Sequence, residues 1–395
     1  MTFQALSSSA AAVRRRLGVR VVDVVSSPTG LVTARAQLHS HGHVWMGWGV
    51  AVDADQAADI ASAECIERWS QHAGADIPVV RGTYREFSPH AVFPPDVGLY
   101  SEAQYLRLSD RIARFDPNQV RSWTPVLDLQ TGNERLVPLE IIRPGAPMPE
   151  LPLVLETSSG TAVGTDAQQA GETAACEVLE RDAALLWWHR RPPTPLWSHA
   201  SVITKDPVTR LQAAGHVVIL LRIDREIPVA TVLAIVLLGR GVAMGLGTHP
   251  NAVTAAEHAL GEVSADLTGG SPRRTVHRPL ALVRTTADHR ALYDHGPWHQ
   301  SLRNALDDTI AMDLPEPPTN GQTAINALAQ GKYTTLTQDL TPPVVRDCGF
   351  TVTRVVVPGL IPHYVGGNLL RLGCTRLTSR HSAGSFDCTL PHPFR

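Results

Sequence analysis

One acidic helical pattern occurs twice in the chain and constrains how the chain can fold. The sequence reads Glu-x-x-Glu-Arg at residues 64–68 and again at residues 177–181. In each copy the two glutamates stand three residues apart, so they lie on one face of a helix. Small residues one turn earlier predict that each helix packs closely against a neighbour. Two such helices in contact would bring four carboxylates together: Glu64, Glu67, Glu177 and Glu180.

A single helix with this pattern usually carries it on a solvent-exposed face. Both copies, however, stand among Ala, Cys, Ile, Val and Leu, where an exposed face would be more polar. Carboxylates in such surroundings need cations or hydrogen-bond donors to offset their loss of hydration. Hard divalent cations such as Mg²⁺ prefer oxygen ligands of this kind and often bind together with nucleotide phosphates. The repeated pattern therefore predicts a site for Mg²⁺ and ATP.

A longer signature precedes the second copy, because residues 158–166 read Ser-Ser-Gly-Thr-Ala-Val-Gly-Thr-Asp and lead directly into its helix. Together with the first Glu-x-x-Glu-Arg helix, this signature resembles the YcaO family, ATP-using enzymes that activate backbone amides of peptides. The resemblance extends over nearly the whole chain, and it includes residues 27–32, a strand and turn at residues 354–362, and the C-terminal residues 391–395. It implies one YcaO catalytic domain over residues 1–395, made of sub-lobes.

The same resemblance implies roles for individual side chains. The four glutamates would hold Mg²⁺ on the phosphates of ATP, and Arg181 would contact phosphate oxygens. Thr165 stands where the family often has Asn, and Gln169 stands where Glu is common. Both keep an oxygen that can touch metal or phosphate, but they lower the negative charge and leave the number of Mg²⁺ ions open. Trp48, between two glycines, is expected either on the adenine of ATP or in the core.

The C-terminal tail, residues 390–395, is a further candidate. Azoline-forming members of the family resemble one another in ending with alternating prolines that reach toward the active site. Here residues 391–395 read Pro-His-Pro-Phe-Arg, so Arg395 replaces the last proline. A disordered end is the alternative. Because the two prolines stiffen the tail, we expect it to be ordered near the site, with the terminal carboxylate of Arg395 as a catalytic group.

Short Val- and Ile-rich strands alternate with Ala-rich helical stretches, which predicts an α/β or α+β fold. The resemblance adds that mixed sheets and Ala-rich helices converge on a central nucleotide site. We expect helices over residues 55–73, 167–190 and 251–267 and a buried strand over residues 229–238. The third helix carries Glu262 where the first two carry a glutamate, within a weak repeat of strand, glycine turn and helix. Ala265 stands where its second glutamate would fall, so this copy is expected to have lost the metal-binding pair.

Composition excludes several classes of protein. The 395 residues include 43% hydrophobic side chains and carry a formal charge of −2, which argues against a nucleic-acid partner. The longest apolar run, residues 229–238, is too short to span a membrane, and no signal peptide is recognisable, so a cytoplasmic location is expected. Five cysteines without a Cys-x-x-Cys pair argue against a disulfide framework and a zinc site. No P-loop is present in the sequence, so ATP must bind in another way.

The resemblance implies an ATP-dependent cyclodehydratase that converts Cys, Ser or Thr of a ribosomal precursor peptide to thiazoline or oxazoline. A YcaO enzyme that forms a thioamide or a macrocyclic amidine is the alternative within the family, and a non-catalytic scaffold subunit is the alternative outside catalysis. The expected partners are the precursor peptide, an E1-like or other leader-binding protein and a flavin dehydrogenase that acts later on the azoline. An oligomer is expected as well.

Overall fold

The computed structural model describes residues 3–73, 76–191, 194–196, 202–224, 226–238, 241–269, 280–293, 297–307, 309–311, 322–379 and 391–394. Within these ranges, helices are interspersed with three sheets whose strands are almost all antiparallel. The predicted mixed fold of helices and sheets is confirmed. No helix in the described ranges is both long enough and apolar enough to cross a membrane.

The first sheet contains three antiparallel strands, β1 Arg20–Ser26, β2 Val32–Ser40 and β3 His43–Ala51, with β3 at one edge. A two-residue turn joins β2 to β3. Both turn residues, His41 (φ 49°) and Gly42 (φ 77°), have the positive φ that such a hairpin turn requires. The turn therefore fixes the register of β2 against β3 and with it the position of the β3 edge.

The second sheet has six strands in the order β4-β5-β13-β14-β7, with β6 paired to β5 outside this path. Its strands are β4 Val80–Gly82, β5 Arg121–Asp128, β6 Glu134–Pro138, β7 Thr161–Gly164, β13 Leu336–Asp339 and β14 Thr351–Val356. Strand β7 comes from the sequence signature before the second acidic helix, and it forms one edge of this sheet.

The third sheet has five strands in the order β11-β10-β9-β8-β12, with β11 at one edge. Its strands are β8 Thr194–Leu196, β9 Val217–Arg222, β10 Ala230–Leu237, β11 Val242–His249 and β12 Thr309–Ala311. Strand β10 is buried along nearly its whole length, as the apolar run at residues 229–238 predicted. Alternate residues of β10 pack against α6 on one face of the sheet and α8 on the other, which explains why they do not alternate between apolar and polar.

The described residues also contain thirteen α-helices and two 3₁₀-helices. The α-helices are α1 Phe3–Leu17, α2 Ala54–Ala73, α3 Tyr84–Phe87, α4 Glu102–Arg107, α5 Leu139–Ile142, α6 Ala167–Arg190, α7 Val202–Ala213, α8 Ala252–Thr268, α9 Thr286–Ala291, α10 Pro297–Asp307, α11 Ala324–Gln330, α12 Pro343–Arg346 and α13 Thr375–Thr378. The 3₁₀-helices are η1 Pro94–Val97 and η2 Leu280–Leu282. Helices α2, α6 and α8 match the three predicted helices to within one residue at each end.

Two strand–helix pairs, β3 with α2 and β11 with α8, pack with their backbones in direct contact. A Cβ atom on Gly49 of β3 would lie 2.0 Å from the carbonyl oxygen of Ala57, and one on Gly247 of β11 would lie 2.0 Å from that of Ala255. Only glycine in the strand and small residues in the helix allow this approach. The predicted repeat is therefore present in both pairs, although its glycines lie within the strand and not in a turn.

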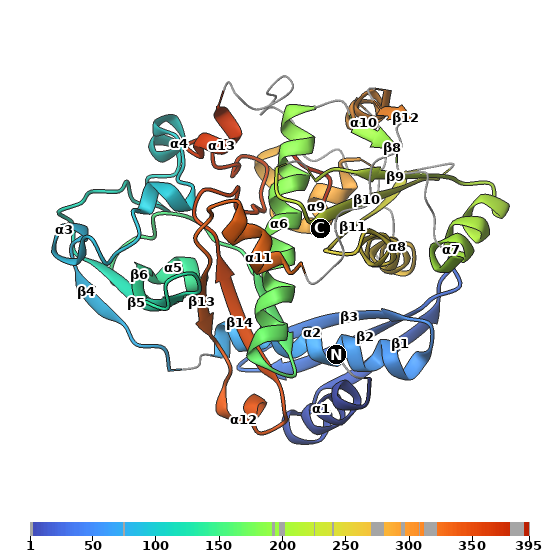
Figure 1. Cartoon of the computed structure of the whole chain (residues 1–395), viewed down its shortest axis with the longest axis horizontal. Helices are drawn as coiled ribbons and strands as arrows, with labels where there is room; N and C mark the ends of the chain where they lie inside the picture. Colours follow the sequence, from blue (N-terminus) through green and yellow to red (C-terminus); the bar gives the residue numbers. More distant parts are fainter. Residues whose placement is uncertain are drawn as a thin grey trace.

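Helix α6 is the central element of the molecule. Figure 1 shows it running between the second sheet, at β13 and β14, and the third sheet, at β9 to β11, with the first sheet and α2 near its N-terminal end. The side chain of Asp166 begins the helix by accepting the N–H of Gln169 at 2.8 Å. Because α6 contacts β7, β14 and β11, its side chains face two sheets at once.

Candidate functional site

Two glutamates from equivalent helices bind the free edges of two sheets. An edge strand has backbone N–H groups that no neighbouring strand accepts. Glu64 of α2 accepts the N–H of Trp48 on β3 at 2.5 Å, and Glu262 of α8 accepts the N–H of Leu246 on β11 at 2.8 Å. Both pairs are 16 residues apart in the sequence. The two strand–helix pairs therefore present equivalent carboxylates.

The edge of the second sheet receives glutamates from two different helices. Glu67 of α2 accepts the N–H of Val163 on β7 at 3.3 Å. Glu177 of α6 accepts the N–H of Gly160, directly before β7, at 3.1 Å. Both acidic helices thus contact β7, which lies between their glutamates, and the carboxylates at all three sheet edges lie in one region.

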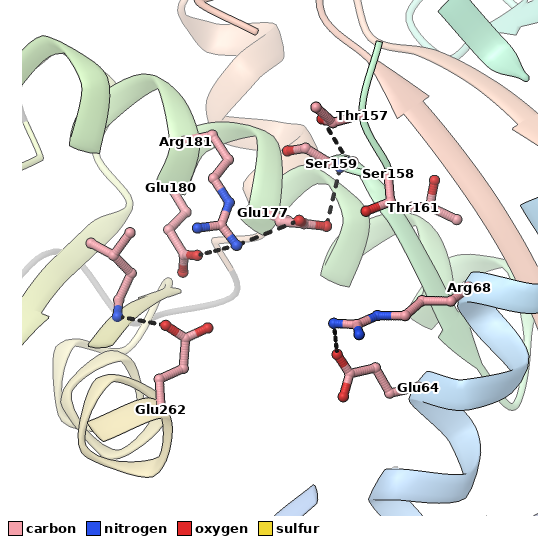
Figure 2. Close-up of polar contacts among 12 residues, drawn as sticks. Glu64, Arg68, Thr157, Ser158, Ser159, Thr161, Glu177, Glu180, Arg181 and Glu262 are labelled. Atoms are coloured by element: carbon pink, nitrogen blue, oxygen red, sulfur yellow. Dashed lines mark hydrogen bonds and ion pairs between the residues drawn. The ribbon is translucent and has the colours of Figure 1, made fainter. Parts of the chain in front are cut away.

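Two arginines pair with these carboxylates. Arg68 lies 2.5 Å from Glu64, and its guanidinium group lies over the ring of Trp48 at 5.0 Å from the centroid. Arg181 lies 3.7 Å from both Glu177 and Glu180. Figure 2 shows side chains from α2, α6 and α8 pointing toward one another: Glu64 and Arg68, then Glu177, Glu180 and Arg181, and finally Glu262.

Burial and mutual repulsion disturb the titration of the glutamates. Burial raises the pKa of Glu67 well above its ordinary value, and the charges of Glu177 and Glu64 raise it further. Burial also raises the pKa of Glu177, although Arg181 opposes this. The pKa of Glu180 rises to about 8, through burial and then the charges of Glu262 and Glu177, against the effect of Arg181. Such shifts indicate negative charge that the protein alone does not offset.

The donor set fits Mg²⁺ with bound phosphate, but the side chains must move to hold it. Five carboxylates face three guanidinium groups, those of Arg68, Arg181 and Arg354, and all carboxylate oxygens are hard donors. In the described part of the chain, however, no three acidic, His or Cys side chains are placed to hold one ion. Glu64 and Glu177 bind arginine instead. Direct coordination of a cation by Glu64 or Glu177 would therefore compete with these ion pairs.

The three other predicted contacts to nucleotide lie around this region. Thr165 donates its backbone N–H and its hydroxyl to the amide oxygen of Gln169, both at 3.0 Å, so the two residues bind each other at the start of α6. Trp48 lies half-buried at the β3 edge beneath Arg68 and is not part of the core. The structure therefore places Trp48 at the site and leaves Thr165 and Gln169 at the helix end beside it.

A cavity with about 460 Å³ of empty space, part of it open to solvent, adjoins the carboxylates. Arg181, Arg354, Ser159 and His363 are among the residues that line it. Arg354 is buried, which lowers the pKa of its guanidinium group, and it donates to the carbonyl oxygen of Thr157 at 3.0 Å. Among the residues that the structure describes, its Nε has no hydrogen-bond partner. Two cationic groups thus face one cavity next to an excess of carboxylates, a combination that suits phosphate together with a metal ion.

Part of the predicted C-terminal tail is described, and it lies beside the carboxylates. Pro393 and Phe394 line a second cavity together with Glu262. Phe394 is buried against Trp187 and Trp188 of α6, with ring centroids 6.4 Å apart in both pairs. Arg395 lies outside the described residues, so the role predicted for its terminal carboxylate stays a prediction.

Sequence reasoning undervalued two residues of this region. Glu262 was expected to belong to a copy that has lost the metal-binding pair, yet its charge acts on Glu180 and Arg181. Gly49 precedes Glu64 by the same number of residues as Gly247 precedes Glu262. This equal spacing was the signal that could have assigned Glu262 to the site. Arg354 opens the segment at residues 354–362 that carries part of the resemblance, but the resemblance implied no role for this arginine itself.

Comparison with known proteins identifies the family. The family model described as YcaO cyclodehydratase, ATP- and Mg²⁺-binding, matches residues 8–361. A curated relative from Rhizobium leguminosarum bv. trifolii, described as an uncharacterized protein in the tfuA 3′ region, is 25% identical over 267 residues, 62% of this chain and 59% of the relative.

Solved structures share the fold. A heterocyclase in complex with substrate and cofactor superposes with a TM-score of 0.72 and 19% identity, covering 90% of this chain and 52% of the other. YcaO from Methanopyrus kandleri, bound with AMPPCP and Mg²⁺, has a TM-score of 0.65 and 18% identity over 98% of this chain and 95% of the other. The heterocyclase TruD has a TM-score of 0.64 and 22% identity, covering 85% of this chain and 50% of the other. The chain thus spans about half the length of these heterocyclases.

The family description confirms the two cofactors predicted from the sequence, ATP and Mg²⁺. The match covers well over half of the chain, and the arrangement of sheets and helices agrees with the solved structures. The chain therefore belongs to the YcaO family.

Proposed function

We propose that the chain is an ATP-dependent cyclodehydratase that converts Cys, Ser or Thr of a ribosomal precursor peptide to thiazoline or oxazoline. The observation that carries the proposal is the meeting of Glu64, Glu67, Glu177, Glu180 and Glu262 at the three sheet edges, next to the cavity lined by two arginines. A scaffold without catalysis would not need to keep Glu67, Glu177 and Glu180, whose pKa values burial raises.

The proposed reaction has three steps. The side-chain nucleophile of the peptide loses its proton and adds to the preceding backbone carbonyl carbon. The former carbonyl oxygen then attacks the γ-phosphorus of ATP and displaces ADP. Finally the C–O bond breaks, phosphate leaves with the bonding electrons, and the amide nitrogen loses its proton to form the C=N bond. Phosphate rather than water thus leaves the peptide, which makes the cyclisation favourable at neutral pH.

The protein's contribution is orientation and electrostatic stabilisation. When bound, Mg²⁺ neutralises charge on the transferring phosphoryl group. The glutamates of α2, α6 and α8 are proposed as its ligands, directly or through water. Arg181 and Arg354 are proposed to hold phosphate oxygens, since both line the cavity. Thr165 and Gln169 are proposed to border the phosphates, and Trp48 to border the base.

The proposed partners are the precursor peptide and a separate protein that recognises its leader. Two observations on similar proteins support this. One heterocyclase was solved with substrate and cofactor, and this chain spans 52% of it. A second similar structure is the E. coli microcin synthetase McbBCD complex with pro-MccB17 bound, with a TM-score of 0.65. We expect little conversion of a full precursor by the purified chain alone. Complete conversion without a partner would contradict this part of the proposal.

Nucleotide binding separates the enzyme from the scaffold. We expect Glu177→Gln to reduce peptide-dependent ATP turnover by about a hundredfold, a loss typical for removal of one preorganised charge in an active site. Folding stability should change little. The matched control is Glu102→Gln on α4, because Glu102 is exposed and pairs only at the surface with Arg114. Absence of Mg²⁺-dependent ATP binding in the wild-type chain would favour the scaffold.

The product distinguishes the proposed reaction from its alternatives in the family. Mass spectrometry of the treated peptide should show a net mass decrease equal to one water for each modified Cys, Ser or Thr, because the oxygen leaves with phosphate and two protons are lost. Replacement of an amide oxygen by sulfur would instead identify a thioamide-forming enzyme. Water loss that joins two distant residues, seen by fragmentation, would identify a macrocyclic amidine.

A further inference from the structure

A buried cluster of histidines holds the C-terminal residues 391–394 against the rest of the molecule. His289 comes from α9, His363 and Tyr364 from the segment after β14, and His392 from the C-terminal segment itself. The rings of His289 and His392 stack with centroids 4.4 Å apart and planes 20° apart, and His363 lies 4.9 Å from His392. All four side chains are buried.

The hydrogen bonds of the two stacked rings fit only neutral imidazole. Nε2 of His289 accepts the N–H of Gly366 at 2.8 Å, so its Nδ1 carries the proton that it donates to the carbonyl oxygen of His392 at 2.9 Å. Nδ1 of His392 accepts the N–H of Phe394 at 3.2 Å, and its Nε2 donates to the carbonyl oxygen of Tyr364 at 2.8 Å. A second proton on either ring would point at a backbone N–H group.

The groups around the rings would not stabilise a positive charge. His189 of α6 binds the hydroxyl of Tyr364 at 3.3 Å, and this hydroxyl also accepts the N–H of His392. Tyr293 donates to the carbonyl oxygen of Pro391. Arg181 and Arg371 add positive charge near His363. The acidic group that acts on His289 is Asp288, whose carboxylate already accepts the N–H groups of Arg284 and Thr285.

The direction of the effect of pH follows from this environment. Burial lowers the pKa of His289 and lowers the pKa values of His363 and His392 much further. A histidine outside this environment titrates near about pH 6.5. As the pH falls below that value, the free histidines of an opened segment take up protons that the closed segment cannot. Acid therefore favours the opened segment, and the closed segment is stable at neutral pH and above.

We propose that His289, His392 and Tyr364 form an imidazole clasp, which positions residues 391–394 beside Glu262 and opens in mild acid. The clasp itself does not depend on the proposed reaction, but its consequence for catalysis does. Because Pro393 and Phe394 line the cavity at Glu262, opening the clasp exposes that side of the candidate site to water. ATP-dependent activity would then fall in acid before the protein unfolds.

Hydrogen–deuterium exchange of the C-terminal peptide tests the clasp without nucleotide or substrate. In the wild-type chain we expect the backbone amides of His392 and Phe394, the two residues of this segment that are not proline, to lose protection by at least about tenfold between about pH 7.5 and pH 5.5, after correction for the intrinsic rate, since one pKa unit corresponds to a factor of ten. Peptides from α2 and β10 should keep their protection. The double variant H289Q/H392Q keeps His363 but has no titrating group in the stack, so its loss of protection between the two pH values should be much smaller than that of the wild type.

The matched control is His90→Gln, because His90 is exposed and distant in sequence from the clasp. This variant should keep the wild-type response to pH. Equal protection of residues 391–394 at both pH values in the wild type would overturn the clasp, as would an unchanged pH response in the double variant. Since no ATP is present, neither result depends on whether the chain is a cyclodehydratase.

Discussion

Under the proposed function, Glu180 connects the protonation of the site to the binding of Mg²⁺ and ATP. Burial raises its pKa to about 8, against an ordinary value of 4.5. The folded protein therefore holds this proton more tightly than the unfolded chain, and Glu180 makes the free energy of unfolding fall as the pH rises from about 4.5 to about 8. A cation that takes the carboxylate as a ligand must displace the same proton.

We therefore predict that the affinity for ATP with Mg²⁺ rises between about pH 6 and pH 8 and that binding releases protons. Calorimetry in two buffers of different ionisation enthalpy measures both quantities. Glu180→Gln should weaken binding and flatten its dependence on pH, whereas Glu102→Gln should change neither. Wild-type affinity that does not vary over this range would show that Glu180 takes no part in binding.

The cysteines next to the carboxylates also hold their protons more tightly than free side chains do, but no role in the reaction is proposed for them. Burial, followed by a neighbouring glutamate, raises the pKa of Cys65 and of Cys176 to about 12. Because the thiolate is the reactive form, we predict that neither thiol is alkylated in the native protein near neutral pH. Mass spectrometry after iodoacetamide treatment measures this, with the unfolded chain as the control. Cys176→Ala should keep ATP-dependent activity. Its loss would assign the thiol a role in the reaction.

At the scale of elements, the close packing of β3 on α2 and of β11 on α8 positions Glu64 and Glu262. We predict that Gly247→Ala destabilises the protein by about 3 kcal/mol or more, because the added methyl group would meet the backbone of α8 at 2.0 Å and overpack it. Denaturant unfolding measures the change.

Gly261→Ala, on the helix of the same pair, is the matched control. A Cβ atom at Gly261 would meet Val50 at an ordinary 3.8 Å, and alanine suits a helix better than glycine by about 0.5–1 kcal/mol. This variant should be neutral or more stable than the wild type. Similar losses in the two variants would show that the close contact of β11 with α8 is not the cause.

Local patterns explain which elements could be predicted. Helices α2, α6 and α8 have uninterrupted Ala-rich runs, so their bounds were predicted to within one residue. The partners of their glutamates could not be predicted, because Glu67 binds Val163 of a sheet 96 residues further along the chain. The pairing of Glu64 with Arg68 was also missed, since the resemblance implied a role for Arg181 of α6 and none for Arg68. Sheet edges are set by the complete topology, which no single segment encodes.

At the scale of the whole molecule, the glutamates of the candidate site bind the edge strands of all three sheets. We predict that ATP with Mg²⁺ raises the free energy of unfolding by about 2.7 kcal/mol when the ligand is present at a hundred times its Kd. Protection from hydrogen exchange should increase at the edges of all three sheets, in β3, β7 and β11. Glu177→Gln should abolish most of this stabilisation. An equal rise in melting temperature for this variant would place the nucleotide elsewhere.

The edges of the three sheets have a further consequence, for the solubility of the protein. An uncovered edge strand is a template on which another chain can add a strand and begin aggregation. Here Glu64, Glu67 and Glu262 occupy N–H groups of β3, β7 and β11 that such a chain would need. The same charges that suit a cation thus also block intermolecular strand pairing. Selection against aggregation would retain these glutamates even in a descendant that had lost its chemistry.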